Sequence, residues 1–141
     1  MISNVFMHIF FYDIWFYFSH VLLHNPYLYH IHKIHHSTNY KKLTYLDTNL
    51  GHVIENCISP LGAFIPFLFK KVDYTHFIIS YFFIGSRAFM RHDNRCSWLI
   101  GNHHILHHKH IKYNYGEYWL DCLFGTCYPN SNEYIFGIIY T

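Results

Sequence analysis

The chain alternates long apolar runs with short polar segments that are rich in histidine. Residues 2–23 form the first apolar run, which is interrupted by His8, Asp13 and His20. A helix of this length would cross a bilayer, which takes about 20 residues. No basic stretch and no small-residue cleavage site accompany the run, so we do not expect a cleaved signal peptide.

Two further apolar runs, residues 57–69 and 72–90, lie in the middle of the chain. The first contains two prolines and a glycine, and its length fits a re-entrant or half-buried segment better than a span. The second is near spanning length. We therefore expect a helical hairpin that dips into the membrane. Its sidedness stays open, because Lys70 and Lys71 at the tip do not satisfy the positive-inside tendency.

The polar segments between these runs predict turns and short helices. Asn25-Pro26 ends the first helix, because the residue before a proline is disfavoured in the helical region. A new helix is expected to begin near Pro26 and to carry the three histidines of residues 32–36. Residues 37–47 are polar and are interpreted as a loop.

The composition narrows the class of protein. Hydrophobic residues make up 52% of the chain and aromatic residues 22%, whereas 13% are charged, which is unusually apolar for a water-soluble protein. The length indicates one domain over residues 1–141. The net charge is +2 and no nucleic-acid motif is present, so no nucleic-acid partner is expected. The cysteines lack C-x2-C spacing and are interpreted as reduced, without a disulfide framework or a cysteine zinc site; they are Cys57, Cys96, Cys122 and Cys127.

Eight of the 15 histidines fall into three phased clusters. The first has the spacing H-x3-H, and the other two share the spacing H-x2-H-H. In a helix, positions i, i+3 and i+4 lie on one face, so the imidazoles of a cluster would point the same way, as ligands of one metal site must. Chance explains this repetition poorly. The clusters are His20 and His24, then His32, His35 and His36, then His104, His107 and His108.

The remaining histidines carry a weaker signal. An isolated histidine is more often a packed or solvated ring, and His8, His30 and His76 are interpreted in that way. His92 directly follows the last apolar run and precedes the third cluster, which makes it a ninth candidate ligand. His110 lies outside the H-x2-H-H spacing, and we expect it to be dispensable.

Two carboxylates stand near these clusters in the sequence. Asp13 lies seven residues before His20, so the two share a helix face. Asp13 is either a helix-end residue at the membrane surface or an acceptor that orients a ligand histidine, and the sequence leaves both interpretations open. Glu55 lies three residues after His52, and these two are expected to form a hydrogen-bonded pair near the site rather than an extra pair of ligands.

Imidazole binds iron, zinc, copper and nickel, so ligand type alone does not choose the metal. Ligand number is more informative, because a structural zinc takes four ligands and a catalytic zinc about three plus water. Eight or nine histidines exceed one tetrahedral ion and suit two adjacent metals. No H-E-x2-H motif is present, which leaves a zinc protease unsupported. Two irons beside a membrane-embedded apolar cavity would suit the use of O2 to attack an unactivated C–H bond of a lipid.

The order and spacing of these motifs resemble the fatty acid hydroxylase/sterol desaturase superfamily over most of the chain. The resemblance is carried by Asp13, H-x3-H at His20/His24, LYHIHKIHHS at 28–37, HVIE at 52–55, the isolated His92, HHILHHKHIKYNYG at 103–116 and D-x-L-F-G-T at 121–126. It implies an all-α integral membrane protein, mostly of the endoplasmic reticulum, whose histidine boxes gather at the cytosolic membrane surface.

The same resemblance implies a non-haem di-iron oxidoreductase that takes O2 as co-substrate. Its electrons would come from a donor such as cytochrome b5 and its reductase, and its substrate would be a sterol or a fatty acyl chain that is hydroxylated or desaturated. Zinc can replace iron in such a site, since imidazole accepts both. The metal ligands carried over from the family are His20, His24, His32, His35, His36, His92, His104, His107 and His108.

Four further residues, Asn114, Tyr115, Gly116 and Asp121, match the family motif without a ligand role that the sequence supplies. Family members usually carry additional membrane helices before the first histidine box, whereas here that box lies in the opening helix. We therefore expect a minimal version, a fragment or a degraded copy of the family domain. The competing interpretation is a non-enzymatic membrane metal-binding protein or an inactive remnant.

Overall fold

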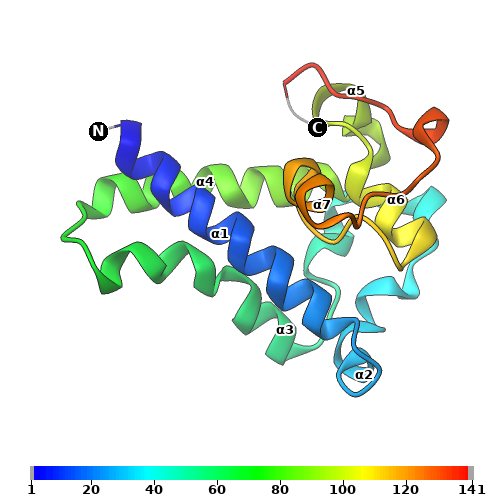
Figure 1. Cartoon of the computed structure of the whole chain (residues 1–141), viewed down its shortest axis with the longest axis horizontal. Helices are drawn as coiled ribbons and strands as arrows, with labels where there is room; N and C mark the ends of the chain where they lie inside the picture. The colour runs from blue at the N-terminus through cyan, green and yellow to red at the C-terminus, as the bar shows by residue number, and fades with distance from the viewer. Residues whose placement is uncertain (1, 140–141) are drawn as a thin grey trace.

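The computed structural model describes residues 2–139. All regular elements within this range are helical, and it contains no β-strand, which confirms the all-α prediction. Long helices form one end of the molecule, and a head of short helices forms the other (Figure 1).

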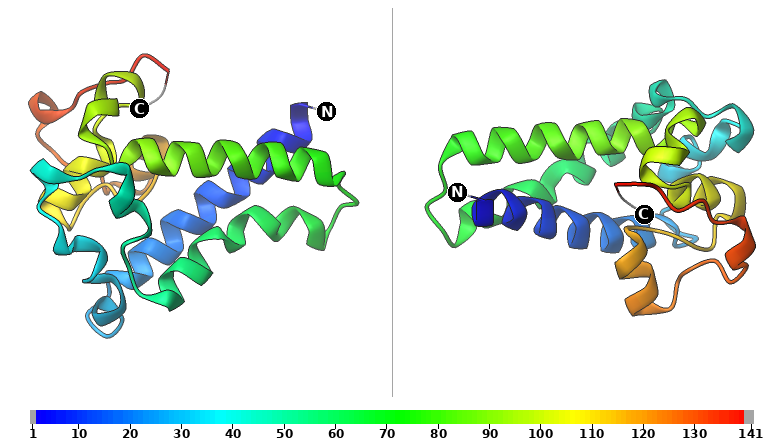
Figure 2. Two further views of the ribbon diagram at one scale, coloured as in Figure 1. Left: turned by 180° about the vertical axis from the view of Figure 1, so that it is seen from behind. Right: turned by 90° about the horizontal axis from the view of Figure 1, so that it is seen from above.

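Three helical arms make up the long end. They are α1 (Ile2–Leu23), α4 (Tyr74–Arg91), and a third arm in which α3 (Val53–Ile58) continues into the 3-10 helix η4 (Ser59–Leu68). The third arm and α4 meet at the loop of residues 69–73 and diverge toward the head, as both Figure 1 and the reverse view in Figure 2 show. α1 packs against η4 and α4. The structure thus contains the predicted hairpin, whereas its insertion into a membrane stays a prediction.

Local sequence explains the close contact between α1 and η4. Pro66 lies inside η4, where it has no backbone N–H to donate and its ring would clash with the carbonyl four residues back in an α-helix, so a regular α-helix is disfavoured here. Gly62 faces α1, and a Cβ at this position would lie 2.4 Å from the Cβ of Trp15. The arms enclose a small apolar core of Tyr12, Ala63 and Ile84, against which Ile9, Phe16 and Phe77 pack.

Much of the apolar surface of the arms faces outward. Among the described residues, α1 is the one helix that is long and apolar enough to cross a membrane. α4, which the sequence placed near spanning length, does not meet that standard. Exposed apolar side chains nevertheless occur on every arm, for example Phe6, Phe10, Phe18, Leu61, Phe64, Leu68, Ile78 and Phe82.

The position of Asp13 contradicts both interpretations that the sequence left open. It lies in the middle of α1 and is buried, so it is not a helix-end residue at a surface. Its carboxylate pairs with the guanidinium of Arg87 on α4 and not with a ligand histidine. Glu117, the residue before α7 (Tyr118–Phe124), also takes part: its Oε1 lies 3.3 Å from Nη2 of Arg87, and it pairs with Arg91. A buried carboxylate is costly unless it has a partner, and here the partner is a cation 74 residues away in sequence.

The head is built from short helices. They are α2 (Tyr29–His32), η1 (His35–Ser37), η2 (Tyr40–Lys42), η3 (Tyr45–Asn49), η5 (Asn94–Cys96), α5 (Ser97–Ile100), α6 (His103–His110), α7 (Tyr118–Phe124) and η6 (Ser131–Glu133). The prediction that one helix carries the second histidine cluster is therefore wrong. α2 ends at His32, and the separate 3-10 turn η1 begins at His35. One helical turn has little stability of its own, so tertiary hydrogen bonds decide the backbone here.

Candidate metal centre

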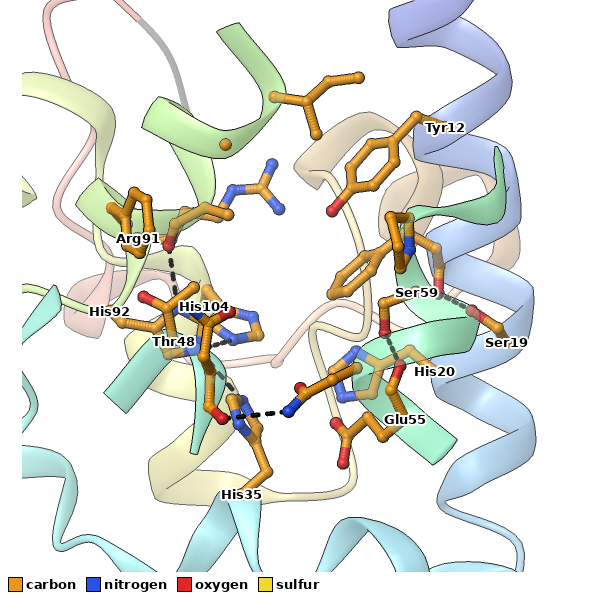
Figure 3. Close-up of a pocket in the computed structure, with 18 of the residues that line it drawn as sticks. Tyr12, Ser19, His20, His35, Thr48, Glu55, Ser59, Arg91, His92 and His104 are labelled. Atoms are coloured by element: carbon orange, nitrogen blue, oxygen red, sulfur yellow. Dashed lines mark hydrogen bonds between the residues drawn. The ribbon is translucent and has the colours of Figure 1, made fainter. Parts of the chain in front are cut away.

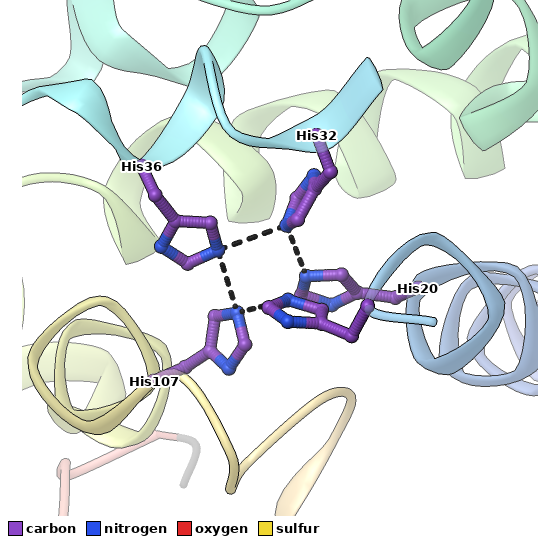
Figure 4. Close-up of side chains that lie close together, drawn as sticks. His20, His32, His36 and His107 are labelled. Carbon is purple, nitrogen blue, oxygen red and sulfur yellow. Dashed lines mark hydrogen bonds between the residues drawn. The ribbon is translucent and has the colours of Figure 1, made fainter. Parts of the chain in front are cut away.

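Nine histidines form two groups in the head. Within each group the candidate ligand nitrogens all lie within 4.8 Å of one another. The first group contains His20, His24, His32, His36 and His107, and the second contains His35, His92, His104 and His108. Figure 4 shows four histidines of the first group converging from α1, the second cluster and α6. These are the nine residues named from the sequence, and their role as metal ligands stays a prediction.

The sequence pattern predicts that the histidines of one cluster serve the same metal site. In the structure, the second and third clusters each divide between the two groups. His104 and His108 are four residues apart on α6 and join the second group, whereas His107 joins the first. Adjacent helix positions differ by about 100° in direction, so His107 and His108 point to different sides. The second cluster also divides, because His35 and His36 are adjacent in η1 and their side chains therefore point in different directions. The ring centroids of His36 and His108 lie 4.7 Å apart, so the two groups are neighbours.

The nitrogens that converge are the Nε2 atoms. In the first group, His32 Nε2 lies 3.0 Å from that of His20 and 2.9 Å from that of His36. His107 Nε2 lies 3.1 Å from both His36 and His24. In the second group, the Nε2 of His92 lies 3.0 Å from those of His35 and His104.

The opposite nitrogen, Nδ1, has a hydrogen-bond acceptor in five of the nine rings. The acceptors are the carbonyl of Tyr115 for His20, the carboxylate of Glu55 for His32, and the carbonyls of Leu50 for His35, Ala88 for His92 and Tyr113 for His107. A carbonyl oxygen can only accept, so Nδ1 carries the proton in these rings. In a neutral imidazole, Nε2 is then left with a free lone pair. This is the arrangement in which outer hydrogen bonds orient metal-binding histidines.

The donor set fits metal ions. Lone pairs that face one another at about 3 Å repel unless a cation lies between them. A bond length of about 2.1 Å and a right angle at the metal would separate two nitrogens by about 3.0 Å, which is the spacing found here. Both ring nitrogens of His108 are buried without a hydrogen-bond partner, and a metal would supply one. The two buried groups can therefore hold metal ions, in agreement with the predicted two-metal site.

Burial keeps these rings neutral. Burial, followed by repulsion from neighbouring imidazoles, lowers the pKa of His36 to about 2. The same two causes lower the pKa of His24 and of His92 to about 3. Because a metal binds only the unprotonated imidazole, the site is ready for metal at neutral pH.

These pKa values predict a pH-dependent stability for the metal-free protein. In the unfolded chain a histidine titrates near pH 6.5. In the folded chain, the pKa is about 3 for His24 and His92 and about 2 for His36, so these rings stay neutral at much lower pH. As pH falls below about 6.5, the unfolded state takes up protons and the folded state does not. The free energy of unfolding should then fall by up to about 1.4 kcal/mol per pH unit for each such ring.

Denaturant unfolding of the metal-free chain at pH 7.5, 6.5 and 5.5 measures this effect. Metal-loaded protein is the control, since bound metal should hold the fold until protons displace it. A stability that stays constant or rises between pH 7.5 and 5.5 would contradict the prediction.

Asp121 explains the motif residues to which the sequence assigned no ligand role. Its side chain is fully buried and accepts hydrogen bonds from the backbone N–H groups of Tyr115 and Gly116 and from the side chains of His103 and Thr126. These bonds fix the loop whose carbonyl at Tyr115 accepts from His20. Asp121 thus supports a candidate ligand without touching it.

Asn114 fixes the same loop from within. It adopts a positive φ of 60°, and its buried side chain bonds the carbonyl of His103 and the backbone N–H of Tyr128. Gly116 follows, where a Cβ would lie 2.9 Å from the ring of Tyr17. The N-Y-G segment is therefore a tight turn packed on α1. The carbonyl of Tyr113 before it accepts from His107, and the carbonyl of Tyr115 within it accepts from His20.

The prediction that His52 and Glu55 form a hydrogen-bonded pair is wrong. The ring of His52 caps α3 by accepting from the backbone N–H of Ile54 at 3.1 Å. Glu55 is buried and accepts instead from Nδ1 of His32 at 2.6 Å. A carboxylate in this position orients the ring and raises the basicity of its other nitrogen. Glu55 belongs to the candidate centre, whereas His52 belongs to the helix start.

A cavity of about 330 Å³ lies against the two groups (Figure 3). Histidines of both groups form one part of its wall, namely His20, His32, His35, His92 and His104. α1 contributes Phe16 and Leu23, α4 contributes Ile84 and Ala88, and the third arm contributes Ser59 and Pro60. The cavity therefore offers a mostly apolar space that is bordered by histidines of both groups.

The other histidines lie outside both groups, as do the last residues of the chain that the structure describes. His110 stacks on Tyr128 with ring centroids 3.8 Å apart, and its Nε2 lies 3.2 Å from Glu133. Asn102 bonds the backbone of Glu133 and of Ile135, so this tail packs over the start of α6. His8, His30 and His76 are also in neither group.

Fold and site together define an all-helical protein with two adjacent, buried histidine groups beside a cavity. Comparison with known families gives the same answer. Residues 5–126 match the fatty acid hydroxylase family, and the chain belongs to that family. No curated protein and no solved structure matched the chain. The resemblance inferred from the histidine boxes is thereby confirmed at the level of the family.

Proposed function

We propose that this protein is a membrane-bound non-haem di-iron oxidoreductase that uses O2 to hydroxylate or desaturate a lipid. The substrate is a sterol or a fatty acyl chain. The observation that carries the proposal is the cavity that ends at histidines of both groups, since it would bring one hydrocarbon segment close to both metals. Membership of the fatty acid hydroxylase family supports the same chemistry.

The donor count favours iron over zinc as the native metal. Zinc in structural sites takes four ligands, whereas the first group offers five imidazoles; the second group offers four, and for it the preference for iron rests on the family. Zinc can still occupy the site in a purified sample, because imidazole binds both metals. When bound, two irons would supply the redox chemistry by which O2, two electrons and two protons convert a C–H bond into an alcohol and water.

The chain itself contributes orientation and a dry environment. Glu55 and the backbone carbonyls described above hold the histidine rings through Nδ1, so that Nε2 faces the site. The side chains of Phe16, Leu23 and Ile84 line the cavity and exclude water from the reacting carbon. Rings held in this way need no rearrangement when metal binds, which favours a stable centre.

Two further parts of the proposal concern location and partners. The exposed apolar side chains on all three arms support membrane attachment, and the family resemblance points to the endoplasmic reticulum with the histidine boxes on the cytosolic side. The electron donor is a carrier such as cytochrome b5 with its reductase. No nucleic acid takes part.

The test compares lipids and metal in one set of cells. We expect cells that express the chain to accumulate a hydroxylated or desaturated lipid, and the purified protein to hold about two metal ions. The control is the double variant His36→Ala/His108→Ala, which removes one candidate ligand from each group. Two bound metals with an unchanged lipid profile would favour a non-enzymatic metal-binding protein or an inactive remnant. One tightly bound ion or none per folded chain would overturn the two-metal centre itself.

A further inference from the structure

One face of α4 presents apolar side chains to the outside at helical spacing. Ile78, Phe82, Gly85 and Phe89 follow one another at intervals of four, three and four residues, so they share this face. Phe82 is 76% exposed and Phe89 is 42% exposed. An outward apolar stripe therefore runs along α4, with a glycine near its centre.

The same glycine lies on the wall of the cavity. Tyr81, Gly85 and Phe89 line the cavity at four-residue intervals, and both aromatic side chains are also exposed. Ile84 and Arg91, which line it from the same helix, are buried. The cavity thus meets the outside of the molecule along Tyr81, Gly85 and Phe89. The space between the two aromatic side chains is open because Gly85 has no side chain to fill it.

Packing does not account for this glycine. A Cβ at Gly85 would meet no neighbouring heavy atom within 4 Å. At Gly62 and Gly116, in contrast, a Cβ would overlap Trp15 and Tyr17, so close contact requires glycine there. Glycine inside a helix is less stable than alanine because it has more freedom to lose on folding. What the chain gains at Gly85 is open space at the edge of the cavity.

We propose that Tyr81, Gly85 and Phe89 form the entrance through which the hydrocarbon chain of a lipid reaches the cavity, and that Gly85 sets the width of what can pass. This inference rests on the proposed lipid oxidation for its occupant. The outer stripe of α4 is apolar, the walls at Phe16 and Leu23 are apolar, and the inner end is formed by metal-site histidines. A hydrocarbon chain would meet mostly apolar side chains on this route, and apolar contact favours it over a charged ligand.

The experiment uses the full chain in phosphatidylcholine nanodiscs and a photoreactive palmitic acid that carries a diazirine in its chain. After illumination, residue-level mapping measures how much probe is attached to Phe16, Ser19 and Leu23, which line the cavity from α1. The variants are Gly85→Ala, Gly85→Leu and Gly85→Phe. The matched control is Ile79→Trp, which adds bulk at an exposed position of α4 that does not line the cavity. Metal content and melting temperature are recorded for every variant.

We expect labelling of Phe16, Ser19 and Leu23 to fall stepwise with side-chain size, by about tenfold in Gly85→Phe, because the larger side chain would fill the open space through which the probe must pass. Ile79→Trp should label like the unchanged chain. If Gly85→Phe fails to fold, Gly85→Leu gives the same comparison. Undiminished labelling in a folded, metal-loaded Gly85→Leu variant would overturn the entrance, and so would labelling of the unchanged chain only on the outer face of α4. Size-dependent labelling without any lipid oxidation would instead overturn the proposed function and leave the entrance standing.

Discussion

Replacing His107 with alanine should abolish lipid turnover and lower the bound metal, whereas His110→Ala should keep most of both. His107 is fully buried, and its Nε2 lies 3.1 Å from those of His24 and His36. The carbonyl of Tyr113 holds its other nitrogen at 2.6 Å. Loss of a neighbour that merely orients a ligand typically costs about 10–100-fold in affinity or activity, and loss of the ligand itself should cost more.

His110 offers a control three residues away on the same helix. It stacks on Tyr128 and approaches Glu133, and it belongs to neither histidine group. The measurement is a paired assay of lipid product and metal content in the two purified variants. Equal losses in both would mean that the site extends to the end of α6. Full activity in His107→Ala would exclude this segment from the metal site altogether.

The nine histidines that the structure brings together could be predicted from the sequence, because candidate metal ligands leave a local signal. Spacings of three and four residues bring imidazoles to one side of a helix, and His92 stands out by its position at the end of an apolar run. How these residues divide was not predictable. The division depends on how each ring is held, and the acceptors for Nδ1 of His32 and His35 are Glu55 and the carbonyl of Leu50, which lie well outside the cluster in the sequence.

Long-range pairing is the other part that the sequence could not supply. Asp13 and Arg87 are far apart in the chain, and so are Arg87 and Glu117, yet all three are buried together. Nothing local marks an arginine in an apolar helix as the partner of a particular carboxylate. The helical class and the hairpin were accessible from apolar runs and prolines alone. The charged contacts between α1, α4 and the residue before α7 needed the fold itself.

A second large effect is expected at Asp121, which the sequence marked as a motif residue without a role. Asp121→Ala would leave four donors without their acceptor, namely the backbone N–H groups of Tyr115 and Gly116 and the side chains of His103 and Thr126. Each buried donor left unpaired costs about 1–3 kcal/mol, so the variant should lose several kcal/mol of stability. The carbonyl of Tyr115 would also lose its fixed position against His20, and metal in the first group should be held more weakly.

Asp73→Ala is the matched control, because it removes an aspartate that caps α4 at an exposed position, where the loss should be much smaller than that of four buried hydrogen bonds. Denaturant unfolding and elemental analysis of both variants measure the two effects. Asp121→Asn should fall between them, since the amide keeps one acceptor oxygen and turns its nitrogen toward donors. If Asp121→Ala proved as stable and as rich in metal as Asp73→Ala, the loop would not depend on this carboxylate. The carbonyls that orient His20 and His107 would then have to be held by Asn114 and its bonds to His103 and Tyr128.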